Sequence, residues 1–400
     1  MKIALLSEHA SPLAALGEVD SGGQNVYVRA LALHLAKLGH DVCVYTRRSD
    51  KSAEQTVQIA PRCRVRHVDA GPARHVPKDD MFPLMDDFAE SLAAIWRHQP
   101  PDVIHAHFWM SGYAAMLARQ PDVPVLQTFH ALGTVKRRHQ AAADTSTIER
   151  LTTEERLVRE ADAIVATCTD EREELVALGA SPSAIEIIPC GVESAIFQPR
   201  GPATSRSARS RVVVTSRLVP RKGIQDAVAA LRLLPTTELV VVGGPPADEL
   251  PDDDEYRRLV TVARHDGVAD RVLFTGGLSQ SAVAAWMRSA DAVIAAPWYE
   301  PFGIVPVEAM ACGVPVIGSA VGGLLDTVAD GRTGFLVEPR DPEAIADRVN
   351  FLLTHPRVRA RMSRAAIARA AVYQWPRIAH RVAALYARAV AARNDLAATS

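Results

Sequence analysis

Short runs of apolar residues alternate with amphipathic helical patterns along the whole chain. Runs of this length without polar alternation are typical of strands buried on both faces of a parallel sheet. The predicted strands of the first half are 3–7, 42–46, 65–68, 103–107, 125–128, 163–166 and 185–188. Those of the second half are 211–215, 239–242, 272–275, 292–296, 314–318 and 334–337. The alternation predicts an α/β fold with helices on both faces of each sheet.

The same pattern predicts two domains and a linker. The predicted helices include 24–38, 86–97, 148–160, 225–233, 282–289 and 378–392. Four hundred residues exceed what one hydrophobic core usually holds. The alternation breaks in a stretch rich in Pro, Gly, Ser and Arg, so we expect a linker at 198–210. We therefore expect doubly wound domains at 1–197 and 211–375, facing across a cleft, and a C-terminal helix at 376–400 that packs back on the first domain.

Composition narrows the class of protein. The chain is 48% hydrophobic and 23% charged, and its net charge of −1 gives no reason to expect nucleic acid as a partner. No apolar stretch reaches the roughly 20 residues of a membrane-spanning helix, and the N-terminal apolar run is broken by Glu8 and His9. The five cysteines lack metal-binding spacing. We expect a cytoplasmic protein of open oligomeric state, with peripheral membrane contact through Arg137 and Arg138 a less favoured alternative.

Lysine is scarce in this chain, which draws attention to the few that are present. Only six of the 45 basic residues are lysines, among them Lys78, Lys136 and Lys222. Lysine is a compact point charge and arginine a planar fork, so the two are not equivalent at a crowded phosphate. A specific role for some of these lysines is therefore a hypothesis, and chance is its alternative.

The segment from Tyr299 to Glu308 follows a predicted buried strand and leads into a helix of small residues. Two carboxylates, Glu300 and Glu308, bracket the expected start of that helix. Backbone N–H groups and the helix dipole at such a start favour an anion. Exposed amides together with two carboxylates suit a ligand that carries both phosphate and hydroxyl groups, such as a nucleotide sugar.

Two further loops of the second half end predicted strands. The segment from Arg217 to Lys222 concentrates cations on a loop limited by Pro220 and Gly223, and such cations could stabilise a diphosphate leaving group. A solvated basic loop is the alternative. A paired glycine, Gly243–Gly244, ends another strand and would allow close approach of a ligand.

The first half offers a glycine pair and a group of histidines. Gly22–Gly23 lies between a strand and a helix, where amides could approach a phosphate, although a plain turn would look similar. His105, His107 and Trp109 lie at one strand end, and His130 ends the next strand. If the first of these strands continued, His107 and Trp109 would point to the same side. A zinc site would need more ligands than this group supplies. The acidic run at 252–255 precedes a helix and is explained by the helix dipole.

Together these segments resemble the retaining GT-B glycosyltransferases of glycosyltransferase family 4, also called group 1. Within the family the chain is similar to the branch of sucrose-phosphate synthases and mycothiol-pathway glycosyltransferases. The resemblance covers nearly the whole chain, and its most specific element is Glu300-Pro301-Phe302-Gly303 with Glu308. The other matching segments are Arg217 with Lys222, Gly22–Gly23 within 20–28, residues 105–112 and residues 130–136.

The resemblance implies a donor site. Arg217 and Lys222 would bind the diphosphate, Glu308 the ribose hydroxyls and Glu300 the transferred sugar. His130 would bind that sugar near the reacting carbon, and Gly23 would place an amide against the distal phosphate. The implied catalytic set is His130, Glu300, Arg217 and Lys222. The remaining implied donor contacts are Gly22, Gly243, Gly244, Phe302, Gly303 and Ile304.

The resemblance also implies an acceptor site in the first domain, at Asn25, Lys78, His107, Trp109, Lys136 and Arg150. Acceptors in this branch are often phosphorylated, so we expect an acceptor with an anionic group. Ala131 and Phe108 stand where the mycothiol enzymes carry hydroxyl-bearing residues, which argues against the same inositol phosphate. We therefore expect a retaining transferase that favours a UDP-sugar and needs neither metal nor cofactor. A nucleotide-sugar epimerase and a non-catalytic nucleotide-sugar-binding protein are the alternatives.

Overall fold

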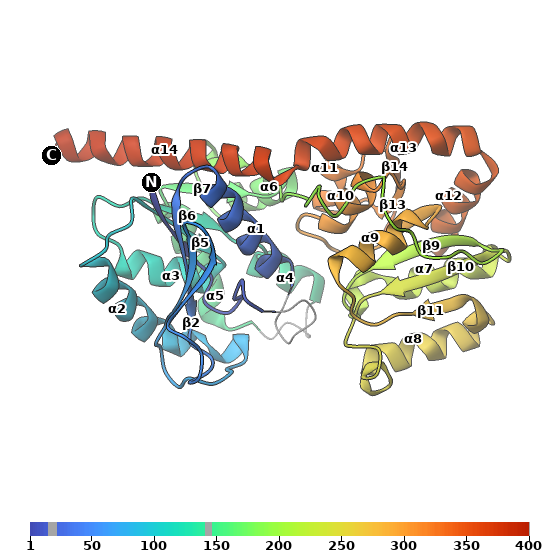
Figure 1. Cartoon of the computed structure of the whole chain (residues 1–400), viewed down its shortest axis with the longest axis horizontal. Coiled ribbons are helices and arrows are strands. Elements are labelled where there is room, and N and C mark those ends of the chain that lie inside the picture. Colours follow the sequence, from blue (N-terminus) through green and yellow to red (C-terminus); the bar gives the residue numbers. More distant parts are fainter. Residues whose placement is uncertain (15–21, 141–145, 400) are drawn as a thin grey trace. The chain divides into compact units, whose positions relative to one another are not determined.

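The computed structural model describes residues 1–14, 22–140 and 146–399, and these residues form two compact units (Figure 1). Unit 1 contains the described residues up to Pro189 together with the C-terminal segment that begins at Trp375. Unit 2 contains Cys190–Gln374.

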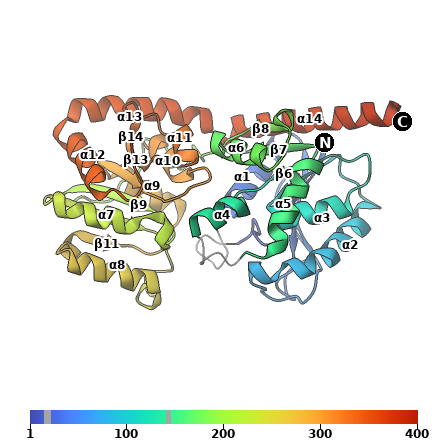
Figure 2. The ribbon, with the colours of Figure 1, turned by 180° about the vertical axis from the view of Figure 1, so that it is seen from behind.

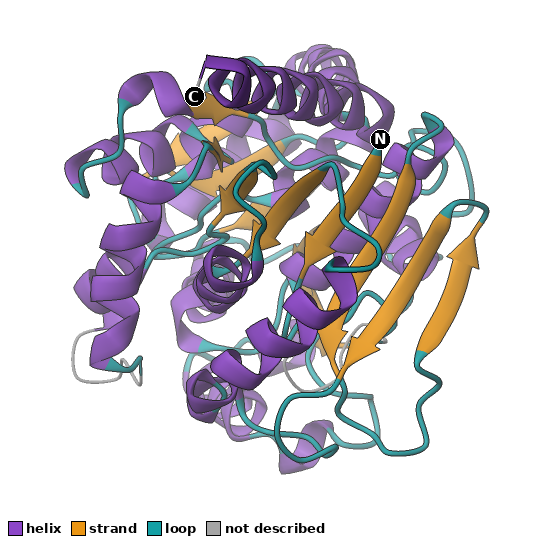
Figure 3. Cartoon of the chain, turned by 90° about the vertical axis from the view of Figure 1, so that its left-hand side faces the viewer, coloured by secondary structure: helices purple, strands orange, loops and turns teal. Residues whose placement is uncertain are grey.

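Unit 1 is built on an eight-stranded sheet in the order β3-β4-β2-β1-β5-β6-β7-β8, part of which faces the viewer in Figure 3. Its strands are β1 (Lys2–Leu6), β2 (Asp41–Arg47), β3 (Thr56–Ala60), β4 (Cys63–Val68), β5 (Val103–His107), β6 (Val125–Thr128), β7 (Ala163–Ala166) and β8 (Ile185–Ile187). Every pairing is parallel except that of β3 with β4. The edge strand β3 was not predicted from the sequence, because none of its residues is buried and such a strand needs no apolar run.

Helices cover both faces of this sheet. They are α1 (Gly23–Lys37), α2 (Met85–Trp96), α3 (Trp109–Ala118), α4 (Gly133–Gln140), α5 (Ile148–Glu160), α6 (Thr169–Ala177) and α14 (Trp375–Thr399). On one face α3 packs between α2 and α5, which Figure 2 shows from behind. On the other face α1 packs against α14, which is longer than the predicted helix 378–392.

Unit 2 is built on a six-stranded sheet in the order β11-β10-β9-β12-β13-β14, and all of its pairings are parallel. Its strands are β9 (Ser210–Thr215), β10 (Thr237–Val242), β11 (Val272–Phe274), β12 (Ala292–Ala295), β13 (Val316–Ser319) and β14 (Gly334–Val337). Its central strands are fully buried, so they lack the alternation of a half-exposed sheet.

The helices of unit 2 also form two layers. They are α7 (Ile224–Ala230), α8 (Asp254–His265), α9 (Gln280–Arg288), α10 (Ile304–Ala311), α11 (Gly323–Thr327), α12 (Pro342–Thr354) and α13 (Pro356–Ala370). α7 packs against α8 and α12, and α10 packs against α9 and α13. The side chain of Asp253 caps α8 by accepting a hydrogen bond from the Tyr256 amide at 2.8 Å, so the acidic run is structural as predicted.

Short 3-10 helices complete both units. They are η1 (Lys78–Asp80), η2 (Phe82–Leu84), η4 (Pro182–Ala184), η5 (Pro220–Lys222), η6 (Leu231–Leu233), η7 (Leu250–Asp252), η8 (Ala269–Arg271) and η9 (Ala371–Tyr373). Across the described residues, no helix has the length and hydropathy that crossing a bilayer would require.

The predicted fold class of two Rossmann-like units with parallel sheets is confirmed. In each sheet the strand order reverses direction at one place, between β1 and β5 in unit 1 and between β9 and β12 in unit 2. Ligands of open parallel sheets bind outside the carboxyl ends of the strands at such a switch point. Both candidate regions described next lie at these two places.

Candidate functional site

In unit 2, the loops that follow β9 and β12 meet at the switch point. Lys222, at the end of η5, forms an ion pair with Glu300, and both side chains are less than one-fifth exposed. Gly223 adopts φ +64, and a Cβ there would lie 1.9 Å from the carbonyl oxygen of Ala296. Because only glycine fits this close approach, the two loops hold Lys222 against Glu300.

The charges of this cluster favour an anion. Burial by itself would raise the pKa of the Glu300 carboxyl, but Lys222 and then Arg221 and Arg217 lower it below its ordinary value. Glu300 is therefore ionised at neutral pH. Three cations gather near one carboxylate, so the cluster has an excess of positive charge. A diphosphate is the type of ligand that would use this excess.

Two glycines at the end of β10 support the cationic loop. Gly243 has φ +130, and a Cβ there would lie 2.1 Å from the carbonyl oxygen of Ser216. Gly244 has φ +97, and a Cβ there would lie 2.8 Å from a methyl carbon of Leu218. These contacts place both glycines against the residues on either side of Arg217. The pair that was predicted to contact the donor thus has a packing role in shaping the loop.

The helix start predicted between Glu300 and Glu308 is present. α10 begins at Ile304, and its N-cap Gly303 has φ +83. Phe302 is buried, and the Glu300 carbonyl accepts a hydrogen bond from the Gly323 amide at 3.0 Å. Burial raises the pKa of Glu308 to about 7, so this carboxyl titrates near neutrality.

In unit 1, three histidines lie at the carboxyl ends of β5 and β6. The imidazole of His105 contacts the Tyr386 hydroxyl at 2.7 Å and the Thr128 hydroxyl at 2.8 Å, and His107 Nδ1 lies 3.0 Å from His130 Nε2. Burial lowers the pKa of His105 and of His130 to about 3, and it lowers the pKa of His107 well below its ordinary value. All three imidazoles are therefore neutral, able to donate or accept hydrogen bonds without carrying charge.

Two of the residues at these strand ends have left-handed backbones, Phe108 with φ +83 and His130 with φ +61. The Phe108 amide donates to the Thr128 carbonyl at 2.8 Å, and the Phe108 carbonyl accepts from Gln127 Nε2 at 3.0 Å. Such strain persists only where surrounding bonds enforce it. The strand ends at His107 as predicted, so the condition under which His107 and Trp109 would point to the same side is not met, and Trp109 begins α3.

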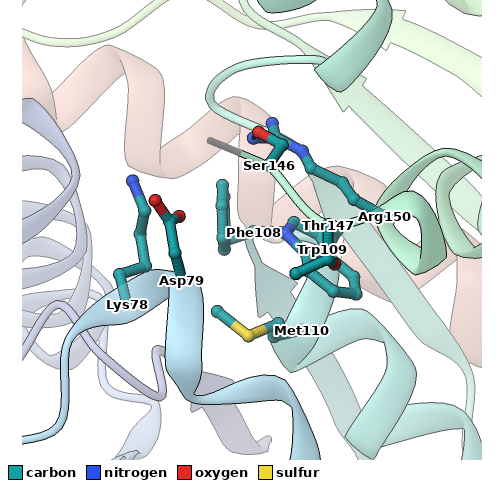
Figure 4. A pocket seen from close by; sticks show the side chains of 8 residues that line it. All are labelled: Lys78, Asp79, Phe108, Trp109, Met110, Ser146, Thr147 and Arg150. Atoms are coloured by element: carbon teal, nitrogen blue, oxygen red, sulfur yellow. Dashed lines mark hydrogen bonds between the residues drawn. The ribbon is translucent and has the colours of Figure 1, made fainter. Parts of the chain in front are cut away.

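A pocket opens beside Phe108 (Figure 4). Its lining residues are Lys78, Asp79, Phe108, Trp109, Met110, Ser146, Thr147 and Arg150. Lys78 Nζ lies 5.7 Å and the Arg150 guanidinium carbon 5.0 Å from the centre of the Phe108 ring. Figure 4 shows these two cations on either side of the ring. The lining thus combines an aromatic wall with two cations and one carboxylate, Asp79, and this excess of positive charge suits a compact anionic molecule.

The two cations of the pocket differ in their burial. Arg150 is almost fully buried, and it donates to Glu154 at 2.8 Å, to the Ala131 carbonyl at 2.6 Å and to Ser146 at 3.3 Å. Lys78 is half-buried on η1. Arg150 therefore holds the wall of the pocket together, and Lys78 is the more accessible of the two cations.

The other predicted acceptor residues lie around this pocket in different ways. Lys136 Nζ donates to Ser146 at 3.0 Å, so it touches the wall from outside the lining. His107 is fully buried and contacts His130, and neither histidine lines the pocket. Asn25 accepts from the Gly22 amide at 3.0 Å and donates to the Ser11 carbonyl at 2.9 Å, which fixes the start of α1 at Gly23. Residues 15–21 of the glycine loop lie outside the described residues.

A buried polar group that was not predicted lies just after the end of β1. The Ser111 hydroxyl donates to the Glu8 carboxylate, and Nδ1 of His9 donates to the same carboxylate at 2.6 Å. His9 also packs its edge on Phe108, with ring centres 4.9 Å apart. The position of Glu8 and His9 directly after a buried strand could have identified them, because His130 was found in that way.

No three His, Cys, Asp or Glu side chains gather as metal ligands in residues 1–14, 22–140 or 146–399. The five cysteines, all within the described residues, are buried free thiols.

Two family descriptions match this chain. Residues 21–195 match Glycosyltransferase Family 4, and residues 200–369 match Glycosyl transferases group 1. A D-inositol 3-phosphate glycosyltransferase from Frankia alni is 36% identical over 402 residues, covering 96% of this chain and 98% of the relative. The enzyme of the same name from Mycobacterium tuberculosis strain H37Ra is 37% identical over 410 residues, covering 98% and 84%.

Solved structures agree with these matches. A sucrose-phosphate synthase from Thermosynechococcus elongatus superposes with a TM-score of 0.90 at 33% identity, over 98% of this chain and 99% of that chain. Anabaena Alr3699/HepE in complex with UDP-glucose superposes with a TM-score of 0.71 at 22% identity, over 97% and 100%, which is a likeness of fold alone.

Proposed function

Since the chain belongs to the family 4, group 1 glycosyltransferases, we propose that it transfers a sugar from a UDP-sugar to a hydroxyl of a small phosphorylated acceptor. The observation that carries the proposal is the cluster at the switch point of unit 2, in which Lys222 pairs with Glu300 while Arg221 and Arg217 also lower the pKa of that carboxyl. A departing nucleoside diphosphate develops negative charge, and preorganised cations stabilise it.

The donor residues have separate proposed roles. Arg217 and Lys222 bind the diphosphate, and Glu300 binds hydroxyls of the transferred sugar. Glu308 accepts hydrogen bonds from the ribose, and the amides that follow Phe302 at the start of α10 face the anion. The relevant support is that Glu300 is ionised and that α10 starts between the two glutamates.

We propose that the reaction proceeds with retention of configuration and without a metal ion. The acceptor oxygen attacks the anomeric carbon on the face from which the diphosphate leaves, and the bond from that carbon to the phosphate oxygen breaks. The proton of the acceptor hydroxyl passes to the departing phosphate oxygen. His130 is neutral, so it can hydrogen-bond the donor sugar without competing for the phosphate charge.

We propose that the acceptor binds beside Phe108 through its anionic group. The support is a pocket with Lys78 and Arg150 on either side of an aromatic ring, together with relatives named D-inositol 3-phosphate glycosyltransferase. Phe108 offers no hydroxyl to its ligand. The acceptor class that fits is therefore a phosphorylated polyol or sugar. Inositol phosphate is one of several members of this class.

A thermal-shift panel of UDP, ADP, GDP and dTDP tests the donor. A ligand at 100 times its Kd stabilises by about 2.7 kcal/mol, so the preferred nucleotide should give the largest rise in melting temperature. We expect UDP to lead, with the same rise in EDTA. If another nucleotide gave a larger rise in melting temperature, that nucleotide would replace UDP as the proposed donor base. If none of the four gave a rise, the proposed donor site would be refuted.

Turnover distinguishes a transferase from the alternatives. Each UDP-sugar is incubated with D-inositol 3-phosphate, glucose 6-phosphate or fructose 6-phosphate, and the product is identified by mass and by the anomeric coupling in its NMR spectrum. A retained anomeric configuration is expected. Conversion of the donor sugar to its epimer without acceptor would indicate an epimerase, and binding without any turnover would indicate a non-catalytic protein.

A further inference from the structure

The start of the short helix α11 lies against the backbone that carries Glu300. α11 (Gly323–Thr327) follows β13 and packs against α10 (Figure 1). The amide of Gly323 donates a hydrogen bond to the carbonyl oxygen of Glu300 at 3.0 Å. We call residues 300–303 the sugar segment, because the function proposed above assigns the transferred sugar to them. The bond from Gly323 therefore ties α11 to the sugar segment.

Gly323 leaves no room for a side chain at this contact. A Cβ there would lie 2.3 Å from the carbonyl oxygen, 2.4 Å from the Cα and 2.6 Å from the carbonyl carbon of Phe302. All three are backbone atoms, so no side-chain rotation would relieve the clash. The φ of Gly323 lies outside the left-handed region, so glycine is required here for its size and not for its conformational freedom. The two backbones thus touch directly, and the position of Gly323 sets that of Phe302.

The next residue, Leu324, makes a second contact with the sugar segment. Its side chain is completely buried. One of its methyl carbons lies 2.7 Å from the point that a Cβ of Gly303 would occupy, and the other lies 3.0 Å from the corresponding point at Gly318. Leu324 therefore fills the space between β13 and Gly303, the N-cap of α10. Two successive residues of α11 thus contact the last two residues of the sugar segment.

Hydrogen bonds from α13 and η9 hold the far end of α11. Arg369 donates through Nε to the carbonyl oxygen of Thr327 at 2.6 Å and through a terminal nitrogen to that of Asp326. The hydroxyl of Tyr373 also donates to the Asp326 carbonyl, at 3.2 Å. A helix of five residues has little stability by itself, so these bonds keep it in place. α11 is therefore a fixed support for the sugar segment.

The loop that carries Lys222 is supported by a different contact. Gly223 brings that loop against the carbonyl oxygen of Ala296. The contacts of Gly323 fall instead on residues 300–303. The diphosphate and the sugar of a bound donor would therefore meet parts of unit 2 that different contacts hold in place.

We propose that Gly323 is a positioning residue for the transferred sugar. Its close contact with Phe302 sets the sugar segment so that the Glu300 carboxylate meets the hydroxyls of that sugar. This inference rests on the proposed donor site. It divides the affinity for a nucleotide sugar into two parts: the sugar part depends on Gly323, and the nucleotide part does not.

Titration calorimetry with three probes tests this division. UDP, UDP-glucose and UDP-N-acetylglucosamine are each titrated into the wild type and into Gly323→Ala. The added methyl group must push the backbone of Phe302 away and move Glu300 with it. The Kd of a UDP-sugar that the wild type binds should rise about tenfold or more, the value of one hydrogen bond to a charged group. The Kd of UDP should stay unchanged.

Gly334→Ala is the matched control for a backbone clash. A Cβ at Gly334 would lie 1.9 Å from the carbonyl oxygen of Val316, and the φ of Gly334 is also outside the left-handed region. This contact joins the amino ends of β13 and β14, at the opposite edge of the sheet from the sugar segment. Gly334→Ala should lower the melting temperature as Gly323→Ala does, and it should leave all three Kd values unchanged.

A second variant loosens α11 without adding an atom to the contact. Arg369→Gln removes the guanidinium that bonds the Asp326 and Thr327 carbonyls. Because this change acts on the sugar segment only through α11, we expect the Kd of the UDP-sugar to rise about threefold, with that of UDP unchanged. Arg364→Gln, at an exposed position of the same helix, should match the wild type for all three probes.

Each outcome supports or overturns the inference. Unchanged affinity of Gly323→Ala for the UDP-sugar, an equal loss of UDP and UDP-sugar, or the same loss in Gly334→Ala would overturn it. If Gly323→Ala does not fold, Arg369→Gln decides by the same criteria. If the wild type binds UDP but neither UDP-sugar, the nucleotide site stands and this inference fails. If the wild type binds none of the three, the proposed donor site fails and the inference fails with it.

Discussion

The two sheets have the same parallel architecture but differ in the charge of the side chains that follow their strands. In unit 2, Lys222 forms an ion pair with Glu300, and Arg221 and Arg217 also hold the pKa of that carboxyl below its ordinary value. In unit 1, His107 and His130 are neutral and bonded to each other. Parallel strands deliver side chains to the same edge in both sheets, so the difference comes entirely from the residues that follow each strand.

This difference matches two tasks of glycosyl transfer. A leaving diphosphate needs fixed positive charge, and a sugar hydroxyl needs hydrogen-bonding groups that do not attract the phosphate. Backbone geometry differs as well. Unit 2 relies on glycines such as Gly223 for its close approach, whereas unit 1 places Phe108 and His130 at positive φ, and hydrogen bonds to Thr128 and Gln127 hold the backbone of Phe108.

The largest expected effect comes from removing the charge of Lys222. Lys222→Ala leaves Glu300 buried without its partner and removes a cation from the departing phosphate. We expect kcat/KM for the donor to fall by about 10²–10³. Lys51→Ala, at an exposed position, should match the wild type in the same steady-state assay. A fall of less than fivefold in Lys222→Ala would break the assignment of the charged region to the diphosphate.

A pair of glycine variants tests the geometry that supports this charge. Gly223 and Gly267 have nearly the same φ, +64 and +67, but only Gly223 packs against backbone. Both alanine variants carry the cost of a left-handed alanine, roughly 1 kcal/mol. Only Gly223→Ala should also displace Lys222 and weaken UDP binding, by about tenfold or more in titration calorimetry. Equal UDP affinity in the two variants would contradict the role of the loop contact.

Glu308 should make donor binding depend on pH. Burial raises the pKa of Glu308 to about 7, so the carboxylate proposed to accept ribose hydrogen bonds is increasingly protonated as pH falls below 7. UDP affinity should therefore drop roughly tenfold from pH 8 to pH 6, since about one carboxyl in ten stays ionised one unit below its pKa. In Glu308→Gln only the titration of UDP itself should remain. An identical pH dependence of Kd in both proteins would remove Glu308 from the ribose site.

The neutral histidines should affect stability more modestly. The pKa of His130 is about 3 in the folded protein, below the ordinary value of 6.5, so the unfolded chain takes up protons first as pH falls. Stability is complete above pH 6.5 and is lost as pH falls toward 3, by at most about 1.4 kcal/mol per pH unit. As pH decreases from 7 to 5, the melting temperature of His130→Gln should therefore fall less steeply than that of the wild type. His265→Gln, at an exposed histidine, should leave the slope unchanged.

The sequence predicts the regular parts of this molecule well and the side-chain partners poorly. Buried strands are recognisable in the sequence as apolar runs. Three of them therefore have the predicted bounds: Val103–His107, Val125–Thr128 and Ala163–Ala166. The edge strand β3 was not predicted, because a strand at the edge of the sheet needs no such run. The positive φ of Phe108 was not predicted, because it is imposed by hydrogen bonds to Gln127 and Thr128 on the neighbouring strand.

The candidate site shows the same division. Glu300, Glu308 and Lys222 were predicted from a motif, and the structure brings Lys222 and Glu300 together. The partner of Arg150 was not predictable, because the burial of Glu154 depends on how α5 packs. For this reason Arg150→Ala would unpair a buried carboxylate, and Lys78→Ala is the cleaner test of the acceptor site.

The most direct test of the division between the two regions is one crossed binding experiment. Titration calorimetry measures UDP and D-inositol 3-phosphate on Lys222→Ala and on Lys78→Ala. The account predicts that Lys222→Ala loses affinity for UDP alone and that Lys78→Ala loses affinity for inositol phosphate alone, each by at least tenfold. Loss of both ligands in either variant, or loss of the opposite ligand, would contradict it.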